Sequence, residues 1–168
     1  MKKLQLLITK NISTVFLRLA LVGLGLFVLV LCLVVLPAIY SGWSREFPDL
    51  SLLRFPVLVG LGTTAIAFFV ALFHSWRLLG YIDTGNTFSL KSVRALRAIS
   101  YCAGIIAVLY TGAMPIHYNI AQEEDAPGLI IYGALFVGIP AAIAVFARLV
   151  EKLLQQVIAI KSENDLTV

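Results

Sequence analysis

Four long apolar runs without a single charged residue constrain this chain more than any other feature. They cover residues 19–44, 55–73, 98–116 and 126–147, and each is 19 residues or longer. An α-helix of that length crosses the roughly 30 Å hydrocarbon core of a membrane. In water, a chain of 168 residues could not bury four helices that are apolar on every side. The sequence therefore predicts an integral membrane protein, in agreement with a charged fraction of 13% against about 25% in soluble domains.

The spacing of these runs predicts an all-α fold, an integral membrane bundle of four transmembrane helices that forms a single domain over residues 1–168. We expect the spans at about residues 15–40, 55–76, 96–116 and 127–149, followed by a tail at residues 150–168. Small residues at four-residue spacing let helices approach closely. We expect three such stripes to face the bundle interior: Thr63, Ala67 and Ala71; Ala103, Ala107 and Thr111; Ala134, Gly138 and Ala142.

Prolines should interrupt the helices, because proline lacks a backbone donor and its ring clashes with the preceding turn. We expect Pro37 to close the regular part of the first span and Pro115 to end or bend the third. Pro140 lies in the middle of the fourth span, where it predicts a kink.

The distribution of positive charge predicts the orientation. Eleven of the 13 basic residues flank the spans on one side, and only Arg45 and Arg54 lie on the other. Positive segments stay in the cytoplasm. We therefore expect a multi-pass protein of the bacterial cytoplasmic (inner) membrane, a plasma membrane, with both termini cytoplasmic. The same distribution explains the net charge of +4 without direct nucleic-acid binding.

The span interiors contain no Asp, Glu, Lys, Arg or His. Proton relays, coupled transporters and intramembrane enzymes usually depend on such groups. His74 and His117 fall at opposite membrane faces, and neither has a companion at metal-ligand spacing. We therefore expect a protein that is not an enzyme, with no catalytic residue, no metal site and no cofactor.

Four polar side chains lie at similar depth in two neighbouring spans. Thr63 and Thr64 are in the second span, and Tyr110 and Thr111 are in the third. A Tyr–Thr hydrogen bond between these spans is one interpretation. A small ligand pocket at this depth is the alternative.

The segment between the second and third spans holds the most distinctive cytoplasmic residues. Its turn chemistry lies at residues 83–86, and Ser89 is suited to cap the helix that follows. We expect a partner-docking surface here, formed by Asp83, Gly85, Asn86, Phe88 and Ser89. Lys91, Arg94 and Arg97 follow at three-residue spacing, where they can contact lipid headgroups or the partner.

Two terminal segments complete the predicted cytoplasmic face. Residues 1–13 mix leucine and isoleucine with lysine, as in an interfacial helix on anionic lipid. The fourth span continues into a heptad-like stripe that predicts packing on the inner loop, on the membrane surface or at a homo-oligomer contact: Phe146, Val150, Leu153, Val157 and Ile160. The chain ends in four residues that we expect to join the docking surface: Asp165, Leu166, Thr167 and Val168.

Three sequence blocks resemble a known family. They are Ile82-Asp83-Thr84-Gly85-Asn86-Thr87-Phe88-Ser89, then Val93-Arg94-Ala95-Leu96-Arg97-Ala98-Ile99, and the ending Lys161-Ser162-Glu163-Asn164-Asp165-Leu166-Thr167-Val168. Together with the four-span layout, they are similar to the bacterial DUF2975 membrane proteins. The resemblance implies a small four-helix inner-membrane protein, often encoded beside a small helix-turn-helix regulator of the Xre type. The family brings no established activity.

Two functions therefore compete. The first is a non-enzymatic, regulatory membrane partner of a small Xre-type helix-turn-helix transcription factor. The alternative is a small transporter, channel or immunity-type protein that acts within the bilayer. Membrane lipids are partners in both cases.

Overall fold

The structure, a computed structural model, describes the backbone of residues 2–46 and 52–166 and the side chains of residues 14–42 and 52–163. This part of the chain is built from four helices: α1 (Lys2–Glu46), α2 (Arg54–Asp83), α3 (Leu90–Glu123) and α4 (Gly128–Leu166). Each of the four is long and apolar enough to cross a membrane. The predicted all-α membrane fold with four transmembrane helices is confirmed.

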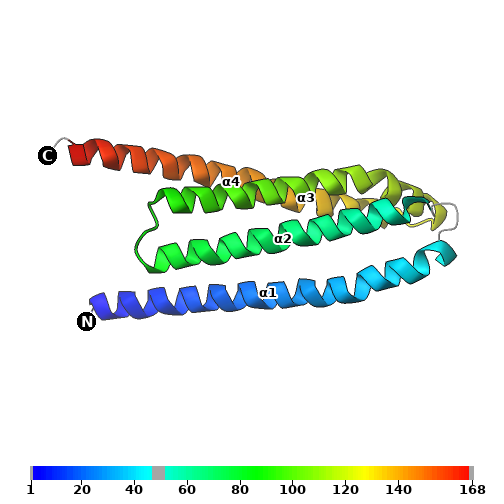
Figure 1. The fold of residues 1–168 in the computed structure, drawn as a ribbon, viewed down its shortest axis with the longest axis horizontal. Coiled ribbons are helices and arrows are strands. Elements are labelled where there is room, and N and C mark those ends of the chain that lie inside the picture. The colour runs from blue at the N-terminus through cyan, green and yellow to red at the C-terminus, as the bar shows by residue number, and fades with distance from the viewer. Residues whose placement is uncertain (1, 47–51, 167–168) are drawn as a thin grey trace.

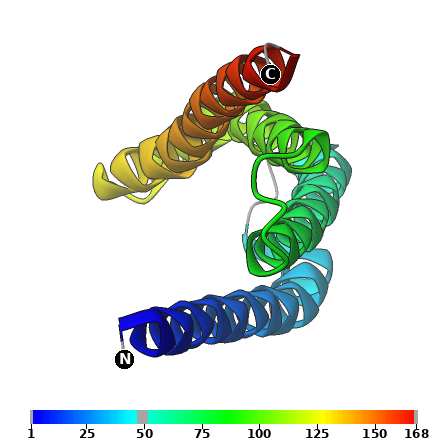
Figure 2. The same cartoon turned by 90° about the vertical axis from the view of Figure 1, so that its left-hand side faces the viewer.

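Successive helices run antiparallel and follow an open arc rather than closing into a ring (Figures 1 and 2). Within the described residues, α1 packs on α2, α2 on α3 and α3 on α4, and no other pair of helices is in contact. The first turn of α1, the last turn of α4 and the α2–α3 loop lie at one end of the molecule (Figure 1). We call this the termini end, and the end with the α3–α4 connection the opposite end.

The backbone follows the local chemistry at the α2–α3 loop. Gly85 adopts a φ of +75°, which a side chain would disfavour. Ser89 has an extended backbone, and its hydroxyl accepts a hydrogen bond from the amide of Ser92. The predicted turn and the predicted helix cap at Ser89 are both confirmed.

Helix ends differ from those expected. Helix α1 continues through Pro37 to Glu46, and α3 does not end at Pro115 but continues to Glu123. The predicted interfacial helix at residues 1–13 is not separate, because residues 2–13 form the straight start of α1 (Figure 1). The helix keeps its other backbone hydrogen bonds when it continues. Ending it within an apolar medium would leave backbone groups unpaired, which costs more free energy than continuing.

Close packing is concentrated between α3 and its two neighbours. Ala67 of α2 and Cys102 and Ile106 of α3 form a buried cluster, with Phe68 and Tyr110 partly buried against it. The predicted interior stripes on these helices are right at their alanines, since Ala67, Ala103 and Ala107 are all buried. Thr63 and Thr111 are exposed at the ends of their stripes.

The predicted stripe on α4 is wrong. Ala134, Gly138 and Ala142 face outward, and α3 is contacted by a different face of the helix. Ala147 is buried there, and the Ser100 hydroxyl of α3 donates a hydrogen bond to the Ala144 carbonyl over 2.9 Å. Two small-residue stripes exist on this helix, and four-residue spacing alone does not say which one faces α3.

Among the described residues, helix α1 packs on α2 alone, with an arginine contact toward each end of the interface. The Arg18 guanidinium lies 5.3 Å from the centre of the Trp76 ring of α2. At the opposite end, the Arg54 guanidinium of α2 lies 4.0 Å from the centre of the Tyr40 ring of α1. Most large apolar side chains of α1 are exposed, as expected for a helix that faces lipid.

The α3–α4 interface gives a first prediction. A Cβ atom at Gly133 would lie 2.9 Å from the Met114 sulfur and 3.5 Å from the His117 ring, whereas one at Gly138 would meet nothing. We expect Gly133→Val to lower the free energy of unfolding by about 1–3 kcal/mol through overpacking. Gly138→Val, with the same change in helix propensity, should have little effect.

Thermal unfolding in detergent, followed by circular dichroism, measures the difference. Equal midpoints for the two variants would show that the α3–α4 contact at Gly133 is not as described.

Candidate functional site at the termini end

The α2–α3 loop, residues 84–89, is held in place by hydrogen bonds from both helices. The amide of Asn86 donates to the Tyr81 carbonyl over 2.9 Å, and the amide of Gly85 donates to the Ile82 carbonyl over 3.3 Å. From the α3 side, the Ser92 hydroxyl donates to the Asn86 carbonyl over 3.4 Å, and Ser92 is completely buried. The loop is therefore a shaped surface, fixed at Asn86 by contacts to α2 and α3.

Most of the expected docking residues of this loop are accessible. Asp83, Gly85 and Asn86 are exposed, and Phe88 presents 57% of its surface to the outside. Ser89 is half-buried, because its hydroxyl is used as the cap of α3. An exposed aromatic ring on a fixed loop has the form of an interface anchor.

Asp83 also has a role inside the molecule. Its Oδ2 lies 2.6 Å from Nη2 of Arg18, so an ion pair joins the last residue of α2 to α1. The side chains are 37% and 30% exposed, which screens the pair and limits its contribution to stability. The location of the ion pair is more important than its contribution to stability, because the pair holds α1 against the start of the loop.

A second group of charges joins α3 to α4, and Glu151 is at its centre. The Glu151 carboxylate accepts hydrogen bonds from Arg97 Nε and from Arg148 Nη1, both over 2.7 Å. Gln155 donates to the same carboxylate over 3.2 Å. The Arg148 guanidinium also stacks 4.7 Å from the centre of the Tyr101 ring. Only 3% of the Glu151 side chain is exposed, so this carboxylate is satisfied by its partners rather than by water.

Sequence reasoning missed Glu151. This residue follows Ala144 and Ala147 along the face of α4 that contacts α3. A lone carboxylate four residues beyond an apolar run, with arginines on the neighbouring helix, was the signal in the sequence. Which α4 face contacts α3 was the missing information.

The three basic residues of α3 separate in the structure. Arg97 is bound to Glu151, whereas Lys91 and Arg94 are exposed and form no ion pair with the described side chains. The free cations near the loop are therefore Lys91 and Arg94.

The structure carries the tail away from the loop. Arg97 and Glu151 lie at the same level of the molecule, since they form a hydrogen bond. From this level, α4 continues about 15 residues to Leu166, whereas α3 reaches the loop within about eight residues. At 1.5 Å per residue, α4 ends about 10 Å beyond the loop. The side chains of Asp165 and Leu166, together with Thr167 and Val168 as a whole, lie outside the described residues.

The predicted hydrogen bond between Tyr110 and a threonine is not formed among the described residues. The Thr63 hydroxyl donates to the Val59 carbonyl and the Thr111 hydroxyl to the Ala107 carbonyl, each over 2.8 Å. The Tyr110 ring instead stacks on Phe136 of α4, with ring centres 5.3 Å apart. Thr63 and Thr111 therefore satisfy their hydroxyls on their own helices, which removes these two residues from contacts between helices.

Comparisons with known proteins agree with this architecture. Residues 38–168 match the family described as protein of unknown function (DUF2975). The chain belongs to this family. It is also 43% identical to the uncharacterized membrane protein YoaS of Bacillus subtilis (strain 168), over 94% of this chain and 99% of that protein. No solved structure matches the chain. The resemblance inferred from the loop, the start of α3 and the tail is thus confirmed.

The Glu151 cluster gives the second prediction. Glu151→Ala leaves the positive charges of Arg97 and Arg148 close together without the carboxylate that they share. The resulting loss of stability is limited only by the partial exposure of the two arginines. We expect the free energy of unfolding to fall by about 1–3 kcal/mol. Glu123→Ala, at the exposed end of α3, is the matched control and should have little effect.

Unfolding by a denaturing detergent, with a double-mutant cycle that includes Arg97→Ala, measures the coupling between the two side chains. A coupling energy of zero would contradict the described pair.

Proposed function

We propose that the protein is a non-enzymatic regulator of the bacterial cytoplasmic membrane that holds a small soluble helix-turn-helix transcription factor of the Xre type at its termini end. The observation that carries this proposal is the extension of α4. It continues past Glu151 with Leu153, Val157 and Ile160 exposed at 53%, 42% and 61%.

The exposed stripe has the spacing that a partner helix would need. Val150, Leu153, Val157 and Ile160 recur every three or four residues along one side of α4. Amphipathic helices bind surfaces of this form through anchors at the same spacing. The predicted packing of the stripe on the inner loop does not occur, so this side of α4 is open to a partner or to lipid.

The α2–α3 loop supplies a second contact of different chemistry. Phe88 offers an aromatic anchor, and Lys91 and Arg94 offer positive charge beside it. The partner surface that fits this end of the molecule is therefore apolar in one part and acidic in another. A helix-turn-helix protein would meet it through a face other than its basic DNA-binding face.

The charge distribution supports the cytoplasmic placement of the termini end. Eleven of the 13 basic residues belong to segments at or near this end, including Arg18, Arg97 and Arg148. A soluble transcription factor can reach the protein only from that side. The absence of ionisable side chains from the apolar runs supports a function other than catalysis.

The alternative, a small transporter, channel or immunity-type protein that acts within the bilayer, finds support in one feature. A cavity is present on the concave side of the arc.

The orientation gives the third prediction. In a background with Cys32→Ser and Cys102→Ala, a cysteine at Ser162 should be protected from a membrane-impermeant maleimide in intact cells, and a cysteine at Asn119 should be labelled. Ser162 and Asn119 are both exposed at opposite ends of the molecule. Labelling after cell lysis is the control for access. Labelling of the Ser162 position in intact cells would place the termini end outside and exclude the proposed partner.

The docking surface gives the fourth prediction. We expect Val157→Glu to weaken membrane recruitment of the proposed Xre-type partner by at least tenfold, because a charge at a buried interface anchor costs more than about 1.4 kcal/mol. Gln156→Glu adds the same charge at an exposed neighbour off the stripe and should change recruitment little. Phe88→Ala tests the loop in the same way, with Leu52→Ala at the opposite end as its control.

Co-sedimentation of the purified transcription factor with vesicles that contain each variant measures the recruitment. Equal recruitment by Val157→Glu, Phe88→Ala and the parent protein would overturn the docking surface.

A further inference from the structure

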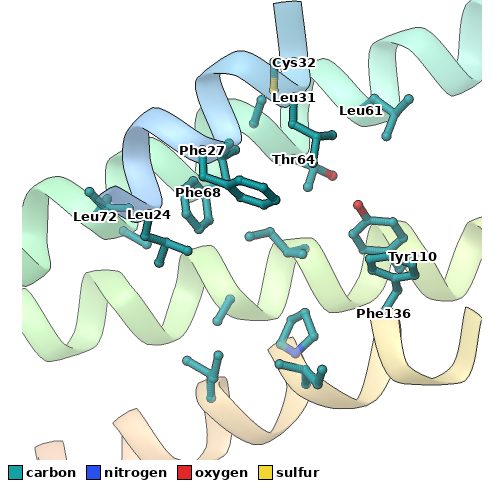
Figure 3. Close-up of a pocket in the computed structure, with 18 of the residues that line it drawn as sticks. Leu24, Phe27, Leu31, Cys32, Leu61, Thr64, Phe68, Leu72, Tyr110 and Phe136 are labelled. Atoms are coloured by element: carbon teal, nitrogen blue, oxygen red, sulfur yellow. The ribbon is translucent and has the colours of Figure 1, made fainter. Parts of the chain in front are cut away.

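An apolar cavity of about 520 Å³ lies on the concave side of the arc and is lined by all four helices (Figure 3). Its lining residues fall within the apolar spans, from Leu21 of α1 to Ile143 of α4. Helices α1 and α4 do not touch, so the cavity has a side open to the membrane between them. Its volume is in the range of small-molecule sites in proteins, about 300–1,000 Å³.

Two hydroxyl groups face this cavity from different helices. Thr64 of α2 and Tyr110 of α3 both line it, and Figure 3 shows their hydroxyls pointing toward one another. Neither hydroxyl has a hydrogen-bond partner among the described residues. The neighbouring hydroxyls do have partners: Thr63 and Thr111 bond to carbonyls of their own helices, and Ser75, which also lines the cavity, bonds to the Ala71 carbonyl over 2.9 Å.

An unpaired hydroxyl in hydrocarbon is unfavourable, because no water is present to accept its hydrogen bond. Thr64 could have bonded to its own helix, as Thr63 does, and it does not. The two hydroxyls together present donors on two sides of a space that is otherwise lined by apolar side chains. A single acceptor atom placed between them would satisfy both.

The surroundings fix the charge of such a ligand. No charged side chain lines the cavity. Thr64 lies ten residues along α2 from Arg54, and Tyr110 lies 13 residues along α3 from Arg97. These separations are about 15 and 20 Å, so the hydroxyls lie near the middle of the bilayer, out of reach of phospholipid headgroups. An ionised ligand group would have no counter-charge at this depth.

We propose that the cavity binds a neutral, membrane-dissolved molecule whose carbonyl oxygen accepts hydrogen bonds from Tyr110 and Thr64. The apolar body of the ligand packs against the rings of Phe27, Phe68 and Phe136, which come from α1, α2 and α4 and line the same space. The ligand enters from the lipid between α1 and α4. This inference is independent of the proposed docking of a transcription factor.

Benzophenone is a suitable probe, because it is a neutral aryl ketone that crosslinks to nearby C–H bonds when irradiated. The full-length protein in phospholipid nanodiscs is irradiated with benzophenone, and the labelled residues are mapped by mass spectrometry. Two competitors of nearly the same shape are added at matched concentrations, dicyclohexyl ketone and dicyclohexylmethane, which lacks the carbonyl oxygen.

We expect label on cavity residues, displaced by the ketone at a concentration about 30-fold lower than by the hydrocarbon. The factor corresponds to two hydrogen bonds of about 1 kcal/mol each. In the variant with Thr64→Val and Tyr110→Phe the ketone should lose this advantage. The matched variant with Thr63→Val and Tyr132→Phe removes two exposed hydroxyls and should keep it.

Three results would overturn the proposal. Equal displacement by ketone and hydrocarbon in the parent protein would show an apolar groove without selectivity for an acceptor. Cavity label that neither competitor displaces would show that lipid chains fill the space. An advantage of the ketone that survives in the Thr64→Val and Tyr110→Phe variant would show that these hydroxyls do not bind it. The first two results need only the parent protein, so the proposal can be refuted even if a variant fails to fold.

Discussion

Hydrocarbon around the protein is the constraint from which the rest of the structure follows. Because no solvent can pair with backbone groups in the bilayer, each span satisfies its own hydrogen bonds as a helix. Burial of apolar side chains brings no gain there, since lipid chains are as apolar as leucine. A closed bundle is therefore not required. The open arc, the exposed apolar surface of α1 and the cavity between the helices can all be stable because hydrocarbon surrounds the protein.

Specific contacts between helices then have to come from close packing and from polar groups at the ends. Alanines on α2 and α3 give the packing, and at the termini end the carboxylates of Asp83 and Glu151 each bind an arginine of a neighbouring helix. The two ion pairs differ in kind. Glu151 is buried and multiply bonded, so it fixes how α4 lies on α3, whereas Asp83 is partly exposed and holds a helix with no other partner than α2.

The sequence was sufficient for the features that depend on one segment at a time. The charge-free runs predicted four membrane helices, Ser89 predicted the start of α3, and the loop and tail motifs predicted the family. Features that depend on how two helices face one another could not be predicted in this way. The α4 residues that contact α3, the ion pair of Arg97 with Glu151, and the unpaired state of Thr64 all depend on the rotation of one helix against another. A periodic pattern with two small-residue faces, as in α4, leaves that rotation undetermined.

The prolines also show what the sequence alone could not predict. In water, Pro37 and Pro115 would be good predictors of helix ends, because the freed carbonyl could bond to solvent. In the membrane the helix continues through both prolines. Local propensity learned from soluble proteins is therefore overridden by the medium.

Helix α1 connects the two proposed sites. Its central part forms one wall of the cavity, with Phe27 facing inward, and its Arg18 is bound to Asp83, where the α2–α3 loop begins. Because α1 packs on α2 alone among the described residues, it can change its tilt without breaking the packing of α3 on α4. An acidic partner at the loop competes with Asp83 for Arg18, and a ligand in the cavity contacts the same helix from within the bilayer. Any free energy that couples the two sites through α1 must act equally in both directions. The least tightly packed helix of the fold is thus the one element that a cytoplasmic protein and a membrane-dissolved molecule could both displace.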